Sequence, residues 1–130
     1  MATATRSDVE VAERFLEALA AADWNGVEAL LAPDVRLRAL VPRTVREDDG
    51  PGAVVGRFKY WWAELDDFRL LDSSVEPFEG QLHVTYRLAG TDADDGPIVV
   101  EQQCYFTVDD GRITKINSVC SGFQPADAPR

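Results

Sequence analysis

The second half of this chain of 130 residues loses the helical spacing of apolar side chains at Phe68 and continues as strand-like runs. These runs are rich in β-branched and aromatic residues, and short segments with Gly, Pro and Asp separate them. The last two runs flank Asp109, Asp110 and Gly111, whose residue types favour the tight turn of a β-hairpin. The pattern predicts four strands, over residues 69–75, 81–88, 98–108 and 112–120.

The first half carries three segments with helical spacing. Ser7-Asp8-Val9-Glu10 has the form of a capping box, which predicts a helix from residue 7 to about residue 22. Asp23 is a good N-cap residue and predicts a shorter helix through residue 31. The pair Gly50-Pro51 predicts the start of a third helix, because proline is well tolerated at the first helical position.

The segments between these helices are shorter. Residues 35–40 alternate between the two faces of an extended chain and predict a half-buried strand. Residues 42–52 are polar and charged and carry Pro and Gly, so we expect a surface loop there, with its acidic residues in solvent. The consecutive residues Tyr60, Trp61 and Trp62 cannot all face the core of the third helix. One or two of them are therefore expected at a pocket mouth or at a subunit interface.

Three helices followed by a mainly antiparallel sheet predict an α+β domain whose helices cover one face of the sheet. Hydrophobic residues make up 45% of the chain and charged residues 28%, a balance that indicates a folded rather than a disordered protein. The length suits one domain over residues 1–130. We expect its core over about residues 7–123, with frayed termini that include the tail from residue 124.

Charge and composition limit the partners. The formal net charge of −10 argues against nucleic-acid binding, since phosphate contacts need a clustered basic surface. No apolar run approaches the roughly 20 residues of a membrane span, and the N-terminus has no hydrophobic signal core. We therefore expect no membrane partner and a cytoplasmic location.

The two cysteines fit a reducing compartment. A hairpin closed at Gly111 places Cys104 near Ile116, and Cys120 near Val100 or Gln102, which argues against a disulfide between the cysteines. The sequence has no phosphate-binding glycine loop, no zinc-ligand spacing and no nucleophile elbow. We therefore expect neither a metal nor a cofactor.

One face of the predicted hairpin has an unusual composition. It carries Gln102, Cys104, Ser118 and Cys120 beside apolar residues, where a plain core would use aliphatic side chains. These small polar groups either line a ligand pocket or are core residues whose hydrogen bonds are satisfied. The sequence leaves both interpretations open.

The order of these segments resembles that of the nuclear transport factor 2-like superfamily, also called SnoaL-like or ketosteroid isomerase-like. The resemblance rests on "LLAPDVRL", "GPGAVVGRF", "VTYRLAGT" and "CYFTVDDGRITKI" and covers residues of roughly 7 to 123. It implies a cone-shaped α+β roll of the cystatin-like type, with a curved, mainly antiparallel sheet wrapped around a long helix and a deep pocket between them. The scaffold hosts isomerases, dehydratases, epoxide hydrolases, polyketide cyclases and non-enzymatic modules, so the fold alone does not give the function.

The resemblance also places residues at the positions of the steroid isomerase groups. Ketosteroid isomerases use a carboxylate base and an oxyanion hole made of a Tyr and a protonated Asp. In this sequence Phe15 aligns with the Tyr, Ala39 with the base and Cys104 with the second donor, which argues against that chemistry. The single histidine, His83, alternates onto the outer face of its strand, which argues against a His-based dehydratase site.

We predict a mostly apolar pocket for a small hydrophobic or polycyclic molecule, in a protein expected to form a homodimer. Tyr86 and Gln102 are its expected hydrogen-bonding groups. An alternative is a cyclase-like or isomerase-like enzyme with Tyr86 as the acid and Gln102 as a polarising group, for which the sequence offers no evident base. Another alternative is a structural or partner-binding module that uses the outer sheet face. The predicted pocket residues are Phe15, Leu37, Phe58, Trp61, Tyr86, Gln102, Cys104 and Ser118.

Overall fold

The computed structural model describes residues 5–126, which form three helices and seven strands. The helices are α1 (Arg6–Ala20), α2 (Trp24–Ala29) and α3 (Pro51–Trp62). The strands are β1 (Leu31–Val41), β2 (Thr44–Asp49), β3 (Asp66–Phe78), β4 (Gln81–Asp92), β5 (Gly96–Asp109), β6 (Arg112–Cys120) and β7 (Gln124–Pro125). The four strands predicted in the second half are confirmed as β3 to β6, and β3, β4 and β5 extend further than their patterns indicated.

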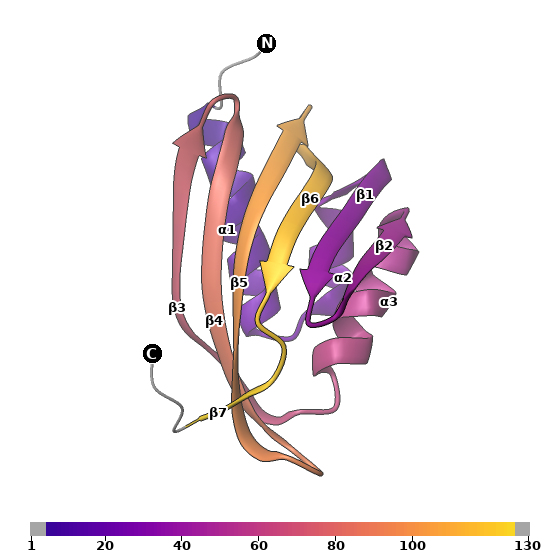
Figure 1. Cartoon of the computed structure of the whole chain (residues 1–130). Coiled ribbons are helices and arrows are strands. Elements are labelled where there is room, and N and C mark those ends of the chain that lie inside the picture. The colour runs from indigo at the N-terminus through magenta and orange to yellow at the C-terminus, as the bar shows by residue number, and fades with distance from the viewer. Residues whose placement is uncertain (1–4, 127–130) are drawn as a thin grey trace.

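The strands form one curved, open sheet in the order β2-β1-β6-β5-β4-β3, and β7 adds to β5. Among the described strands, β1 and β6 pair in parallel and the other neighbours are antiparallel. The helices lie on one side of the sheet (Figure 1), which we call its inner side. The α+β prediction, with a mainly antiparallel sheet wrapped around a helix, is confirmed.

Helix α1 begins earlier than predicted, because a different residue caps it. The Thr5 hydroxyl accepts a hydrogen bond from the Asp8 backbone N–H at 3.2 Å, and the Asp8 carboxylate accepts one from the Thr5 N–H at 3.0 Å. Ser7 lies inside the first turn, so the capping box expected from Ser7 to Glu10 is wrong. A Thr followed three residues later by Asp satisfies the same free N–H groups.

The loop predicted over residues 42–52 is also wrong, because residues 44–49 form β2 at the edge of the sheet. Two ion pairs link this charged strand to its neighbours: Asp48 meets Arg57 of α3 where both are mostly buried, and Asp49 meets Arg36 of β1 in solvent, both at 2.9 Å. An edge strand with nearly all of its side chains in solvent has no alternation of apolar and polar residues, so its sequence resembles that of a loop.

The tail differs from expectation as well. Residues 124–125, expected to fray, form β7 against β5, and residues 127–130 lie outside the described residues. None of the described helices is long and apolar enough to cross a membrane.

The hydrophobic core lies between the helices and the inner face of the sheet. Along β4 and β5, buried residues alternate with more exposed ones, as the period of a strand requires. The buried positions include Leu82, Val84, Tyr86, Val100 and Phe106. The inner side chains of the sheet therefore meet the apolar stripe of α1 and the buried face of α3.

Candidate functional site in the interior of the sheet

Aromatic rings fill the centre of the interior. The ring of Phe15, on α1, lies 5.0 Å from that of Phe106, 6.1 Å from that of Phe58 and 6.3 Å from that of Tyr86, between centroids. Trp62 stacks on Phe58 at 5.4 Å and meets Tyr86 edge-on at 6.4 Å. These five side chains are almost fully buried, so they form one continuous aromatic wall.

A group of polar and sulfur-bearing side chains lies against this wall, on three neighbouring strands. We call it the interior polar cluster, and its members are Tyr86, Gln102, Cys104, Ser118 and Cys120. In the sheet register Tyr86 is opposite Gln102, Gln102 is opposite Cys120, and Cys104 is opposite Ser118. The cluster therefore occupies adjacent positions on one face.

The hydrogen bonds of the interior polar cluster converge on one amide. The Tyr86 hydroxyl donates to Gln102 Oε1 at 3.0 Å, and the Cys104 thiol donates to the same oxygen at 3.8 Å. Within the part of the chain that the structure describes, Gln102 Nε2 and Ser118 Oγ have no partner. In this cluster the Gln102 carbonyl oxygen therefore already accepts hydrogen bonds, while the Gln102 amide N–H₂ group and the Ser118 hydroxyl can still donate one.

The interior is also free of formal charge. Among residues 5–126, the buried side chains include no Asp, Glu, Lys, Arg or His. Burial raises the pKa of Tyr86 well above its usual value near 10, and the nearby Cys104 and Cys120 thiols add to that rise. Burial likewise raises the pKa of the Cys104 thiol, although its interaction with Tyr86 offsets part of the effect. Both groups stay protonated, so Cys104 is not a thiolate nucleophile near neutral pH.

The structure brings most of the predicted pocket residues together. Six of the eight are buried to 0–2% exposure, Ser118 is 5% exposed, and Trp61 is half-buried beside Phe58 and Trp62. Seven of the eight are therefore shielded from solvent, and Trp61 is shielded in part. Trp62 and Cys120 also belong to this interior and were absent from the predicted pocket. Of the three consecutive aromatic residues, Trp62 faces inward and Tyr60 is 77% exposed.

The two cysteines are free, as predicted, although the register of the hairpin differs from the expected one. Cys104 is opposite Ser118 rather than near Ile116, because the turn pairs Asp109 with Arg112 and a β-bulge at Thr107 and Val108 shifts the pairing of β5 with β6 by one further residue. Cys120 is opposite Gln102, one of its two expected neighbours. The turn residues predict the hairpin, but nothing in the sequence indicates the β-bulge.

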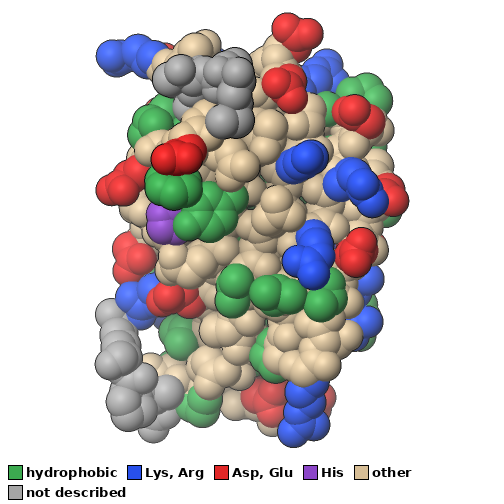
Figure 2. All heavy atoms as spheres, turned by 45° about the horizontal axis from the view of Figure 1, so that its top comes forward, with side chains coloured by type: hydrophobic (Ala, Val, Ile, Leu, Met, Phe, Trp, Pro, Cys, Tyr) green, Lys and Arg blue, Asp and Glu red, His purple; other side chains and the backbone are tan. Residues whose placement is uncertain are grey.

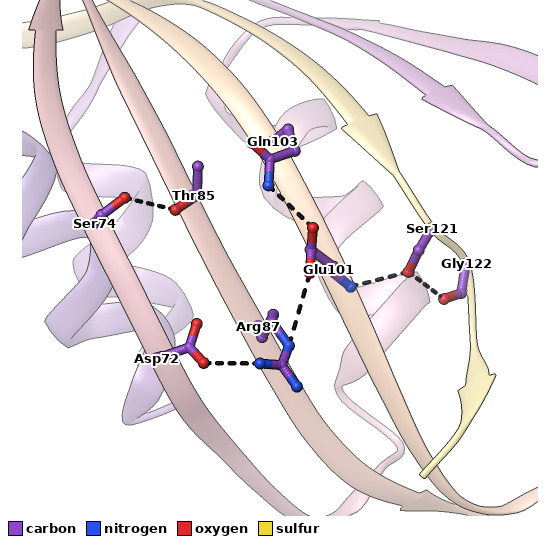
Figure 3. A network of polar contacts seen from close by, with 8 residues as sticks. All are labelled: Asp72, Ser74, Thr85, Arg87, Glu101, Gln103, Ser121 and Gly122. Atoms are coloured by element: carbon purple, nitrogen blue, oxygen red, sulfur yellow. Dashed lines mark hydrogen bonds and ion pairs between the residues drawn. The ribbon is translucent and has the colours of Figure 1, made fainter. Parts of the chain in front are cut away.

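Charged groups of this part of the sheet lie on the outer face. Arg87 binds Asp72 at 2.9 Å and lies 3.7 Å from Glu101, while Ser74 and Thr85 share a hydrogen bond of 2.6 Å (Figure 3). The prediction that His83 faces outward is confirmed by its hydrogen bond to Gln103 at 3.2 Å. No group of three or more His, Cys, Asp or Glu among the described residues could hold a metal ion.

One end of the interior is less tightly closed than the rest. Along β6 the exposure of inward side chains rises from 2% at Ile116 to 9% at Cys120, and Val41 at the end of β1 is half-buried. The chain after β6 turns across this end, and a Cβ atom added to Gly122 would lie only 2.8 Å from the Pro42 ring. The half-buried Phe123 follows and contacts the core. We call this region the β1–β6 end of the interior.

Comparison with known proteins supports the fold and the family. The model of the SnoaL-like domain matches residues 12–116. No curated protein matches the sequence. The match to that model covers most of the chain, including α3 and β3 to β5, and ends at Ile116 within β6, before Ser118 and Cys120.

Several solved structures are similar in fold. A candidate ketosteroid isomerase from Kribbella flavida shares 21% identity over 98% of this chain and 85% of its own, with a TM-score of 0.70. A candidate polyketide cyclase from Xanthomonas campestris shares 22% over 88% and 90%, with a TM-score of 0.69. A nuclear transport factor 2-like protein from Burkholderia xenovorans shares 16% over 92% and 93%, with a TM-score of 0.69. Identities this low support the fold alone. The family model, which matches residues 12–116, shows that the chain belongs to the SnoaL-like domain family.

Proposed function

We propose that this SnoaL-like domain binds a small, neutral, mostly apolar molecule between its helices and the inner face of its sheet. The observation that carries the proposal is the interior polar cluster, five polar or sulfur-bearing groups gathered inside an aromatic wall without any buried charge among the described residues. Ligand sites are typically apolar with a few convergent polar groups that orient the ligand. A core built for packing alone would carry aliphatic side chains at Gln102 and Ser118.

Binding is better supported than acid–base catalysis. A general base needs a group that titrates near the working pH, and the described interior offers no carboxylate or imidazole. Tyr86, the one candidate acid, has its proton engaged by Gln102, and its raised pKa makes it a weaker acid. Among the described residues the interior therefore lacks the acid–base pair that a cyclase or isomerase reaction would need.

Access to the site is expected at the β1–β6 end, where Val41 and Phe123 are half-buried. The side chains close the interior in this structure, so a ligand must displace one of these groups to enter. The segment after β6 is fixed to the sheet through Ser121, whose hydroxyl accepts a hydrogen bond from the Glu101 N–H at 2.9 Å (Figure 3). We infer that Phe123, rather than the sheet, moves aside.

Thermal unfolding with a neutral cyclic probe tests the proposal. Cyclohexanone should raise the unfolding midpoint of the protein in a saturable way, since a ligand that binds only the folded state stabilises it. The variant Cys104→Trp fills the interior, should lose about 1 to 3 kcal/mol of stability by overpacking, and should lose the response to the probe. Val119→Trp adds a similar bulk on the outer face and should keep the response. An unchanged response in Cys104→Trp would place the probe elsewhere.

We also propose that the outer face of the sheet joins two copies of this chain. Apolar side chains are exposed there on three adjacent strands, with Leu40 at 40%, Tyr105 at 37% and Val119 at 54% exposure. They border an open cleft of about 420 Å³ that Arg38 and His83 also line. Exposed apolar groups bounded by polar ones are typical of protein interfaces.

The charges of this face are self-complementary, which favours a second copy as the partner. Lys and Arg side chains lie among Asp and Glu side chains over the β1 and β6 side of the face (Figure 2), where Arg36, which pairs with Asp49, and Arg38 and Lys115 are exposed. Glu76 and Glu101 are exposed on the β3 and β5 side. In a two-fold dimer both copies use the same surface, and the second copy is turned by half a turn relative to the first. The β1 and β6 side of one copy can then lie against the β3 and β5 side of the other, so that basic side chains face acidic ones.

Sedimentation analysis of matched variants tests the dimer. Tyr105→Arg places a charge in the centre of the proposed interface and should convert a dimer into a monomer at micromolar concentration. Tyr60→Arg makes the same change on α3, away from the sheet, and should leave the dimer intact. A monomeric parent protein at high concentration, or equal behaviour of the two variants, would contradict the proposed interface.

A further inference from the structure

Two buried polar groups of the interior have unused hydrogen-bonding capacity. Within the described residues, Gln102 Nε2 and Ser118 Oγ have no partner, although Gln102 is only 1% exposed and Ser118 only 5%. Folded proteins rarely leave buried donors unpaired, because an unpaired donor has lost its hydrogen bonds to water without replacement. The two groups therefore indicate a place where a further partner is accommodated.

The surroundings decide what such a partner must offer. Gln102 Oε1 already accepts from Tyr86 and Cys104, which orients the amide so that its N–H₂ group is the free end. The Ser118 hydroxyl lies on the neighbouring strand, two residue pairs along the ladder from Gln102, which is the next position on the same inner face. Both groups can donate, so the complementary group is an acceptor.

The partner must also be uncharged. Among residues 5–126 no cationic side chain is buried, so a carboxylate or phosphate placed here would lose its hydration without compensation. The aromatic wall of Phe15, Phe58 and Trp62 favours an apolar body around the accepting atom. A carbonyl oxygen on a small hydrocarbon frame satisfies all of these conditions.

We propose that the ligand of the interior is a neutral carbonyl compound whose oxygen accepts from Gln102 Nε2, with the Ser118 hydroxyl as the second donor. This inference rests on the proposed function and adds the chemical class of the ligand. Gln102 and Ser118 are not the positions at which the resemblance places the steroid isomerase groups, since Phe15, Ala39 and Cys104 align with those. The assignment comes from the two unpaired groups and their surroundings.

The test compares two probes that share a shape and differ in one atom position. Cyclohexanone carries a carbonyl oxygen where methylenecyclohexane carries a CH₂ group, and the dissociation constants of both are measured by NMR titration. For each protein we divide the affinity for cyclohexanone by the affinity for methylenecyclohexane. We then divide this ratio in the parent protein by the same ratio in Gln102→Met. This quotient cancels the difference in hydration between the two probes. We expect a quotient of about ten, the usual effect of one hydrogen bond to a buried donor.

Two variants control the comparison. Gln103→Met makes the same substitution at the next residue, which faces outward and binds His83 and Glu101, and should give a quotient near one. Ser118→Ala removes the second donor alone and should lower the preference for the ketone by a smaller factor. In the parent protein, the Gln102 side-chain amide resonance should shift with cyclohexanone and not with methylenecyclohexane, a readout that does not depend on the folding of any variant.

The outcomes separate the two proposals. Equal binding of both probes, with a quotient near one for Gln102→Met, would overturn the carbonyl assignment and leave binding in the interior standing. An amide resonance that ignores both probes while they bind would also overturn the assignment, and would indicate that a water molecule satisfies Gln102. If neither probe binds, the carbonyl assignment and the proposed function both fail.

Discussion

Replacement of Phe15 by Ala should lower the free energy of unfolding by about 3 to 5 kcal/mol, the usual cost of removing a buried aromatic side chain from a core. Phe15 is fully buried and is the one α1 ring that contacts Phe58, Tyr86 and Phe106 together. Its loss would leave a cavity that α1, held to the sheet along its apolar stripe, can fill only in part. Urea unfolding followed by tryptophan fluorescence measures the change.

The matched control for Phe15 is Phe78, whose side chain is 53% exposed at the end of β3. Phe78→Ala removes the same atoms and should cost less than about 1 kcal/mol, since the lost side chain was mostly in solvent. Similar losses for the two variants would mean that Phe15 does not hold the helix to the sheet. The packing of Phe15 against the rings at the centre of the interior would then be incorrect.

The second large effect is expected from a charge placed among the polar groups. In Gln102→Glu the new carboxyl lies in an interior without a buried cation among the described residues, so burial should raise its pKa above that of the unfolded chain. A carboxyl whose pKa is raised by folding leaves stability intact at low pH and removes it as pH rises above the unfolded value. Between about pH 4 and about pH 7 the variant should lose about 3 to 4 kcal/mol relative to the parent protein.

Gln103→Glu is the control for that experiment, because residue 103 is the next along β5 and lies on the outer face. Its carboxyl stays near solvent, so its stability relative to the parent should change by less than about 1 kcal/mol over the same pH range. Chemical unfolding at a series of pH values gives both curves. A flat curve for Gln102→Glu would mean that water or a cation reaches the interior, against a neutral apolar site.

The period of the strands explains why much of the interior was predictable. Alternation along β4 predicted that Tyr86 faces inward and His83 outward, and both were confirmed. The same reasoning gave the inner faces of β5 and β6, including Gln102 and Cys104. The sequence of a half-buried strand indicates which side chains face inward, because only one of its faces is apolar.

Other features depend on contacts that leave no local trace. The third helix was predicted with Trp61 among the pocket residues, whereas Trp62 is the residue that packs inward against Phe58 and Tyr86. Strand β2 was missed because backbone pairing with β1 and an ion pair to Arg57 fix it, rather than apolar side chains. The unpaired amide N–H₂ group of Gln102 could not be predicted either, because the orientation of the amide depends on a hydrogen bond from Tyr86 of another strand.

The central claim is that the interior, and not the outer face, receives a neutral small molecule. Methyl NMR during a titration with cyclohexanone tests it most directly, because inner and outer methyl groups lie close together in the sequence. We expect saturable shifts at Leu37 and Val100, which face the interior, and none at Leu40 and Val119, which face outward. Shifts confined to Leu40 and Val119, or no shift at any of the four residues up to the solubility limit of the probe, would contradict the claim.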